Sequence, residues 1–407
     1  MTIQKPVRLS DVCRQDRTSV KAGQRAELAY IGLESIESNT GRFNEAGLSK
    51  TPEVPLANSF RFGAEHVLYG KLRPYLNKVA LPEFEGKCST EIIPLLPSPD
   101  LDRRFLSYFL RSPRTVSRIS EKTAGARMPR ADMDFIFSLE LVLPQLTEQR
   151  RIVDLLSRAE GIVRLRRDAQ KKAAELIPAI FLDMFGDPSW NPKEWPTLPL
   201  NEVSEVISGV AKGRQLSGDD LIELPYMRVG NVKDGHLDLN EVKTMEIKRS
   251  EVEKLRIEPG DLLMTEGGDP DKLGRAALWC GEIDLCVHQN HIFKVRSNRA
   301  LLLPEYLRSL ASSAYGKAYF LRVAKKTTGI ASINKTQLNA FPVVLPPLDL
   351  QEKFKQRVEA VESVLMQQVS ASATAQSTFD SLLAIHFRFT FVSPRMTNDF
   401  RLDHQDY

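Results

Sequence analysis

The sequence has little of what a membrane protein or a disulfide-bonded secreted protein would need. Its only cysteines are Cys13, Cys88, Cys280 and Cys286, and none forms a CxxC pair, so we expect unpaired thiols in a reducing compartment. No run of about 18 apolar residues occurs, which argues against a membrane-spanning helix. The N-terminus also lacks the apolar segment of a secretory signal. We therefore expect a cytoplasmic protein that does not enter a membrane.

Familiar catalytic motifs are missing as well. There is no GxxxxGK[ST] loop, no GxGxxG after an expected strand and no HExxH, so neither a nucleotide nor a catalytic zinc has an evident site. Cys280, Cys286, His288 and His291 are zinc-ligand types, but the two histidines are three residues apart in an expected strand and would face opposite sides. We predict a non-catalytic chain with no metal and no directly bound cofactor.

The chain does contain two long helical segments. Residues 349–387 have no glycine and no proline, and apolar residues recur every three or four positions in a narrow stripe typical of a coiled-coil seam. About 39 residues at 1.5 Å each predict a rod of roughly 58 Å. The stripe residues that we expect to contact a partner helix are Phe354, Val361, Leu365, Phe379 and Leu382.

A second such segment, residues 144–186, supplies that partner. It opens with Leu-Pro-x-Leu-x-x-Gln at residues 143–149, and residues 345–351 open the other helix with the same pattern. Thr147 and Asp349 stand where N-caps are expected, and Pro178 should kink or end the first helix. The stripe of this helix comprises Ile152, Leu156, Val163, Leu176 and Ile180. We predict an antiparallel, intramolecular coiled coil.

The first helix also has apolar residues beside its stripe. These either form a second surface for another subunit or pack on the globular segments of the same chain, and the sequence leaves both possibilities open. They are Val153, Leu155, Ile162, Leu165, Ile177 and Phe181.

The segments before the two helices also form a repeat. Each contains short strands with polar turns, then a helical stretch (residues 103–110 and 304–311), then a Thr-x-Gly turn before the helix. We predict an α/β (α+β) fold with two similar domains related by a pseudo-two-fold axis and separated by the two helices. The expected domains are 1–143, a helical spacer at 144–186, a second domain at 187–345, a distal spacer at 346–390 and a C-terminal tail at 391–407.

Basic and amide side chains concentrate in turns of both domains. Arginine and lysine pair with phosphates or guanine edges, and asparagine pairs with adenine, so these turns are candidates for DNA binding. Ordinary solvated loop charges would look the same, and the net charge of +4 is only mildly basic. Two similar modules joined by a rigid spacer suit a two-part site on DNA. The candidates are Arg42, Arg61, Lys71, Arg73, Asn77, Lys78, Arg127, Arg130, Lys212, Arg214, Arg228, Asn231, Lys272, Arg275, Lys325, Lys326 and Asn334.

In its repeated motifs and their order, the chain resembles the specificity subunit of type I restriction-modification enzymes. The resemblance covers nearly the whole length and depends on the doubled Leu-Pro-x-Leu-x-x-Gln opening, residues 62–78, residues 259–263, Thr328-Gly329 and Ile333-Asn334. It implies two target-recognition domains that each read half of a split, asymmetric DNA sequence. It also implies helices that recruit two methyltransferase subunits, with motor-nuclease subunits joining a complex for DNA methylation and phage defence. S-adenosylmethionine and ATP-Mg would then belong to those partners.

One difference between the copies concerns a turn, where His66 stands in place of Asp261. The alternative function is a protein–protein adaptor with two globular binding ends, which would show no salt-dependent binding to DNA. The missing catalytic motifs argue against a third interpretation, a self-sufficient methyltransferase or nuclease. If the helices set the gap between half-sites, one inserted heptad per helix (about 10 Å) should lengthen the gap by roughly 3 base pairs.

Overall fold

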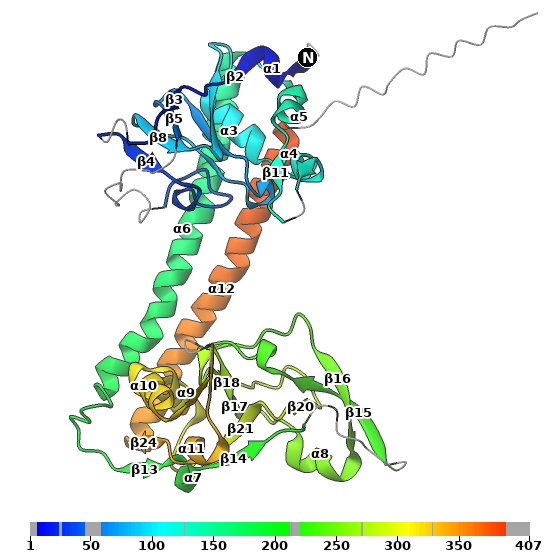
Figure 1. Ribbon diagram of the computed structural model, residues 1–407. Coiled ribbons are helices and arrows are strands. Elements are labelled where there is room, and N and C mark those ends of the chain that lie inside the picture. The colour runs from blue at the N-terminus through cyan, green and yellow to red at the C-terminus, as the bar shows by residue number, and fades with distance from the viewer. Residues whose placement is uncertain are drawn as a thin grey trace, which may run out of the picture. The chain divides into compact units, whose positions relative to one another are not determined.

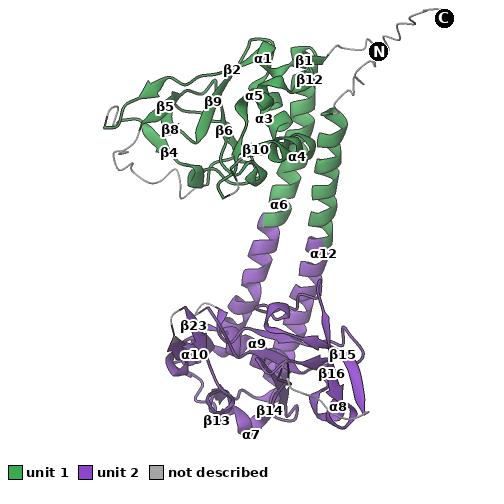
Figure 2. Cartoon of the chain, turned by 45° about the vertical axis from the view of Figure 1, so that its right-hand side comes forward, with its two compact units in different colours: residues 1–167, 370–407 green, residues 168–369 purple. Residues whose placement is uncertain are grey.

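The computed structural model describes residues 6–23, 27–44, 58–125, 127–211, 213, 220–269, 272–327 and 329–387 (Figure 1). The chain divides into two compact units, which Figure 2 colours separately: residues 1–167 with 370–407, and residues 168–369. The first unit is therefore built from two separate stretches of the sequence. We call them unit 1 and unit 2 and describe each by itself.

Unit 1 is built on two four-stranded sheets. One has the order β2 (Cys13–Gln15), β9 (Ile92–Pro97), β6 (Val67–Gly70), β7 (Val79–Ala80), and the other β3 (Ser19–Val20), β5 (Ser59–Phe62), β8 (Gly86–Ser89), β4 (Ala29–Ile31). Two further pairs are β1 (Pro6–Arg8) with β12 (Glu140–Val142) and β10 (Thr123–Ala124) with β11 (Arg130–Ala131). The short helices are α1 (Leu9–Val12), η1 (Leu33–Ser35), η2 (Pro74–Leu76), α3 (Arg103–Arg111), α4 (Pro113–Glu121) and α5 (Met133–Ser138).

Unit 2 repeats this plan. Its main sheet has the order β14 (Ser204–Ser208), β21 (Ile292–Ser297), β17 (Leu262–Thr265), β19 (Ala276–Leu278). The other sheets are β16 (Lys243–Lys248), β15 (Leu221–Met227), β20 (Val287–His288); β18 (Gly267–Gly268), β23 (Ile330–Ser332), β22 (Lys325–Thr327); and β13 (Thr197–Pro199) with β24 (Pro342–Val344). The short helices are α7 (Leu200–Val203), η3 (Val229–Asn231), α8 (Arg249–Leu255), α9 (Pro304–Ser312), α10 (Ala314–Val323) and α11 (Lys335–Asn339).

The correspondence between the units extends to strand direction. β4 pairs with β8 in parallel, and β15 pairs with β20 in parallel, whereas the neighbouring pairs are antiparallel. The sheet β2-β9-β6-β7 matches β14-β21-β17-β19 strand for strand. The predicted α/β repeat is thus confirmed at the level of topology.

The long helices are α6 (Leu146–Phe185) and α12 (Leu348–His386), and both contribute to the two cores (Figure 1). In unit 1 the beginning of α6 packs with the end of α12, through Leu156, Val163 and Phe379. In unit 2 the end of α6 packs with the beginning of α12, where the ring centroids of Phe181 and Phe354 lie 5.8 Å apart. The helices therefore run in opposite directions, as predicted.

Buried glutamines join the start of each long helix to its own unit. The Gln149 amide donates to the carbonyls of Asp100 (2.7 Å) and Pro144 (2.8 Å) and accepts from the Asp102 backbone N–H (2.8 Å). Gln351 makes the same three bonds, with Leu301, Pro346 and Leu303. The glutamine of the repeated sequence motif is thus a structural link between helix and domain, because its polar atoms are buried and paired.

Three local expectations for the helices are corrected. Thr147 and Asp349 are not N-caps, because the carbonyls of Gln145 and Pro347 already accept the first helical N–H groups and the helices begin at Leu146 and Leu348. Of the two outcomes expected at Pro178, an end of the helix is wrong, because α6 continues to Phe185, and a kink stays a prediction.

Leu176 is not a seam residue, since it is 49% exposed. Phe181, expected beside the seam, is instead buried. Eighteen residues make five turns at 3.6 residues per turn, so Phe181 follows Val163 on the same helix face, whereas Leu176 does not. Val153 is likewise buried in the core of unit 1, while Leu155, Ile162 and Leu165 are exposed. Among the described residues, no helix is long and apolar enough to cross a membrane.

Candidate nucleic-acid interface

In unit 1 a loop and a hairpin join to form one surface. The loop, residues 71–78, follows β6, and the hairpin, residues 123–131, contains β10 and β11. The Arg73 N–H donates to the Pro129 carbonyl (2.7 Å) and the Ala131 N–H donates to the Lys71 carbonyl (2.8 Å). Arg73 and Asn77 both have positive φ, 52° and 49°, so η2 is held between two left-handed residues. We call the described residues of these stretches, 71–78, 123–125 and 127–131, the first hairpin–loop surface.

The charges on this surface divide into paired and exposed groups. Arg130 donates hydrogen bonds to the Glu91 carboxylate from Nε (3.1 Å) and Nη2 (2.9 Å). This carboxylate raises the pKa of Arg130. Lys71 lies 4.0 Å from the same carboxylate. Arg73 and Arg127 are exposed, and neither has an ion-pair partner among the described residues. Arg73 and Arg127 are therefore available to an anionic ligand, whereas Arg130 fixes the hairpin.

Asn77 and Lys78 hold neighbouring loops together. Asn77 is buried and donates to Asn39 Oδ1 (3.1 Å) and to the Arg111 carbonyl (3.2 Å). Lys78 Nζ donates to the Leu33 carbonyl (2.6 Å). These bonds fix the loop at residues 33–44, where Arg42 is exposed, against the first hairpin–loop surface. Asn77 and Lys78 are positioning residues in this structure.

Arg61 occupies a different place. It lies on β5 and pairs with Glu85 at 2.6 Å. Among the residues that the structure describes, no hydrogen bond or ion pair joins Arg61 to the first hairpin–loop surface, so the structure does not bring it there.

Unit 2 builds the equivalent surface from residues 266–275 and 325–332. β18 pairs with β23 through Gly267 opposite Ser332, and β23 pairs with β22. The turn of each hairpin holds a glycine with positive φ, Gly125 at 93° and Gly329 at 82°, a conformation that side chains other than glycine rarely adopt. We call the described residues of these stretches, 266–269, 272–275, 325–327 and 329–332, the second hairpin–loop surface.

The second surface is also basic. Lys325 and Lys326 are exposed on β22, and Arg275 is half-exposed beside them in the loop. Lys272 pairs with Asp269 within the loop. Asn334 is exposed and caps α11, its Oδ1 accepting the Gln337 N–H at 2.9 Å. The structure thus gathers four of the predicted basic side chains, with Asn334 following directly after β23.

Arg228 and Asn231 belong to a neighbouring loop of unit 2. Arg228 pairs with Glu241 at 2.7 Å, and hydrogen bonds from Arg228 and Lys243 lower the pKa of Glu241. Asn231 is buried and donates to the carbonyls of Asp238 (2.8 Å) and Glu241 (3.0 Å), so it stabilises this loop. Lys212 and Arg214 lie outside the described residues.

The turn before each central strand explains the exchange of His66 for Asp261. His66 Nδ1 accepts the Gly63 N–H (3.0 Å), and Asp261 Oδ2 accepts the Glu258 N–H (2.8 Å), so both side chains cap the turn from the same position. Each is also paired, His66 with Asp16 and Asp261 with Arg296. The substitution therefore preserves the hydrogen bond that begins β6 and β17.

The histidines and cysteines considered as metal ligands do not converge. His288 is buried, its Nδ1 bonds the Ile292 carbonyl (2.9 Å), and burial lowers its pKa to about 4. His291 is exposed and pairs with Glu266 at 2.6 Å. Cys280 is exposed while Cys286 is buried. Across the ranges that the structure describes, no group of three His, Cys, Asp or Glu side chains is placed to hold a metal.

Sequence reasoning missed the exposed apolar side chains among these charges. Tyr75 is 54% exposed and Met128 47% exposed on the first hairpin–loop surface, and Ile330 is 57% exposed on the second. An aromatic ring between basic residues can stack on a sugar or base. The signal for Tyr75 was its position inside the run Lys71 to Lys78. Met128 and Ile330 gave no comparable signal, because single exposed apolar residues are common on protein surfaces.

Comparison with known proteins places this architecture in a family. The family model described as type I restriction modification DNA specificity domain matches residues 5–175. The chain is 26% identical over 393 residues to the specificity subunit of the type I restriction enzyme EcoKI of Escherichia coli strain K12, covering 89% of this chain and 82% of that protein. The chain is thus similar along most of its length to the type I restriction-modification specificity subunits. The prediction from the sequence is confirmed, and the family is a non-catalytic one.

Other specificity subunits agree with this assignment. That of the StySPI enzyme of Salmonella potsdam is 22% identical over 384 residues, covering 89% of this chain and 82% of that protein. A solved structure concerning assembly of the type I R-M system matches with a TM-score of 0.59 at 20% identity, covering 94% of this chain and 97% of that one. The S subunit from M. genitalium matches with a TM-score of 0.52 at 14% identity, covering 96% and 98%. These two structures support the fold.

Proposed function

We propose that this specificity subunit reads a bipartite, asymmetric DNA sequence, one half with each hairpin–loop surface. The observation that carries the proposal is that the chain builds the same surface twice with different side chains. Arg73, Tyr75 and Arg127 stand on the first, and Lys325, Lys326 and Arg275 on the second. Equal scaffolds with unequal side chains suit two different half-sites. The domain boundaries proposed from the sequence accompany this assignment.

The exposed and the paired side chains have different roles in this proposal. Exposed arginine and lysine contact phosphates, which gives affinity and salt dependence, and a smaller number of side chains read base edges. Asn77, Lys78, Arg130 and Asn231 act by holding loops in place, because their polar groups are already bonded within the protein. Mutation of these four should therefore change affinity by loosening a loop.

The exposed apolar side chains of the long helices fit the proposed recruitment of methyltransferase subunits. In unit 1 they are Leu155, Ile162 and Leu165 on α6 and Ile385 on α12, and in unit 2 they are Leu176 and Leu182 on α6 and Leu348, Val364, Met366 and Val369 on α12. Exposed apolar groups that follow one helix favour burial against a partner. S-adenosylmethionine would be bound by the methyltransferase subunits, and ATP-Mg by motor-nuclease subunits that join in the cytoplasm.

Titration of duplex DNA with the full chain and its methyltransferase partner tests the function. We expect affinity that falls steeply with salt and a genome in which adenines are methylated at one split motif. Deleting the gene for this chain should abolish methylation at that motif. DNA binding that is absent or insensitive to salt, with unchanged methylation after deletion, would favour the adaptor.

A further inference from the structure

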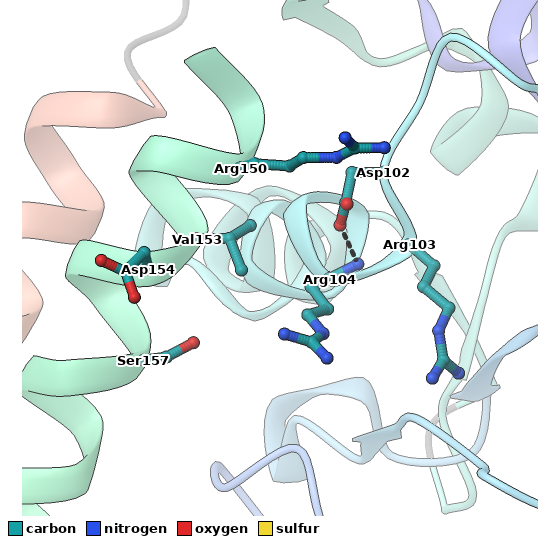
Figure 3. A pocket seen from close by; sticks show the side chains of 7 residues that line it. All are labelled: Asp102, Arg103, Arg104, Arg150, Val153, Asp154 and Ser157. Carbon is teal, nitrogen blue, oxygen red and sulfur yellow. Dashed lines mark hydrogen bonds between the residues drawn. The ribbon is translucent and has the colours of Figure 1, made fainter. Parts of the chain in front are cut away.

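Unit 1 contains a basic hollow that the DNA-reading role does not use. It has a volume of about 440 Å³ and lies between the start of α3 and the first turns of α6 (Figure 3). Figure 3 shows Arg104 projecting from α3 and Arg150 from α6, with Val153 between them. The lining residues are Asp102, Arg103, Arg104, Arg150, Val153, Asp154 and Ser157.

The acidic groups of the hollow are already engaged. Asp102 caps α3, its Oδ1 accepting the N–H groups of Arg104 (2.8 Å) and Phe105 (3.3 Å), and Asp154 pairs with Arg158 at 2.9 Å. Arg104 and Arg150 are exposed, and within the described residues neither guanidinium has an ion-pair partner. Two such cations lining one hollow repel each other, so the fold gains nothing from placing them there.

The second copy shows that the arginines are not required by the architecture. The bonds of Gln149 to Asp102 and of Gln351 to Leu303 align the two junctions. By this alignment Glu305 takes the place of Arg104, Glu352 that of Arg150 and Lys355 that of Val153. Lys355 lies 3.8 Å from Glu305, so at these three positions unit 2 has an ion pair and no unpaired basic side chain. The positive hollow belongs to one copy only.

The position of the hollow argues against DNA as its ligand. Arg103, on its rim, donates to the carbonyls of Ala64 and Pro82, which lie where β6 begins and β7 ends. The first hairpin–loop surface follows the other end of β6. An arginine pair with a hydroxyl beside it, here that of Ser157, suits the planar oxygens of carboxylates.

We propose that this hollow, with Arg104 and Arg150 on its walls, is a docking site for an acidic segment of a protein partner. Within the parts of the chain that the structure describes, the site occurs in one copy of the repeat, so it binds a partner present in one copy or distinguishes one of two like subunits. This inference goes beyond DNA reading and does not depend on it.

The test measures binding of a fluorescein-labelled hexaglutamate peptide to the full chain by anisotropy, with hexaglutamine as the uncharged control. The double variant R104E/R150E gives the hollow the acidic residues of unit 2. The matched control, R164E/R167E, makes the same charge change farther along α6. We expect R104E/R150E to weaken peptide binding by about tenfold or more and R164E/R167E by less than about twofold.

Three results would overturn the proposal: no binding of hexaglutamate by the unmodified chain, equal weakening in both double variants, or a larger loss of duplex-DNA affinity than of peptide affinity in R104E/R150E. The last would assign the hollow to DNA phosphates. The neutral variant R104Q/R150Q provides a second comparison, and thermal melting of every variant confirms that each one is folded.

Discussion

Removing the carboxylate of Glu160 should open the junction between α3 and α6. The Glu160 side chain is 19% exposed and pairs with Arg111, whose side chain is 4% exposed. Glu160 also accepts the Tyr108 hydroxyl at 2.9 Å, and burial together with the Glu160 charge raises the pKa of that hydroxyl to about 12. Glu160→Ala leaves a buried guanidinium without its counter-charge, which typically costs about 3–5 kcal/mol.

Unit 2 supplies a matched comparison. Arg308 pairs with Glu362 at 2.7 Å, and the side chains are 8% and 39% exposed. Water already reaches Glu362, so we expect Glu362→Ala to cost about 1–3 kcal/mol, between the values for exposed and buried pairs. The same chemical change should therefore have unequal effects in the two units.

Hydrogen exchange measured by mass spectrometry can follow each unit separately, which a single unfolding curve cannot. Glu160→Ala should raise exchange in α3 by about 10²-fold or more, and Glu362→Ala should raise exchange in α9 by a smaller factor. Arg111 also donates to the Asn39 carbonyl at 2.9 Å, so the loop at residues 33–44 should loosen with it. Equal effects in the two units, or unchanged protection of α3, would refute this argument.

Three further outcomes are expected. Arg73→Ala and Arg127→Ala should each lower the slope of log affinity against log salt by about 0.9 without changing the methylated motif. Arg61→Ala, at a position already paired with Glu85, should not change the slope. Titrations of duplex DNA from about 50 to about 300 mM salt check both expectations. Burial holds the pKa of His288 near 4, below the 6.5 of the free side chain, so unit 2 should be fully stable above pH 6.5 and lose about 3 kcal/mol as the pH falls through 4. In urea unfolding monitored by hydrogen exchange, His288→Asn should flatten the dependence of the stability of unit 2 on pH. An unchanged pH profile would assign the loss of stability to other groups. One heptad inserted into each long helix should lengthen the gap between methylated half-sites by roughly 3 base pairs, and an unchanged gap in a methylation map would contradict the spacer role.

The features that could be predicted from the sequence are those that recur in it. The repeated Leu-Pro-x-Leu-x-x-Gln motif located both long helices, because proline bars an earlier start and the glutamine is bonded identically in both copies. The antiparallel direction of the two helices also followed from this repeat. The exact seam did not, because a list of apolar letters does not fix the helix face, as Leu176 and Phe181 show.

The candidate interface was predicted less completely. The turns were correctly chosen as basic, but the sequence cannot separate a lysine or arginine that faces solvent from one that bonds a distant carboxylate. Arg130 reaches Glu91 across 39 residues, and Lys78 reaches the Leu33 carbonyl across 45. Such pairs depend on tertiary folding and leave no local pattern. The pairing of the loop with the hairpin leaves no local sequence pattern either, because it is made by backbone atoms.

The divided make-up of unit 1 sets an order of events during synthesis. Phe379, Leu383 and Phe387 complete its core, and they leave the ribosome after the whole of unit 2, residues 168–369. Unit 2 is one continuous stretch of sequence, so all of its residues leave the ribosome earlier. The half that is translated first is thus finished last, and its apolar interior stays open to chaperones until the final helix arrives.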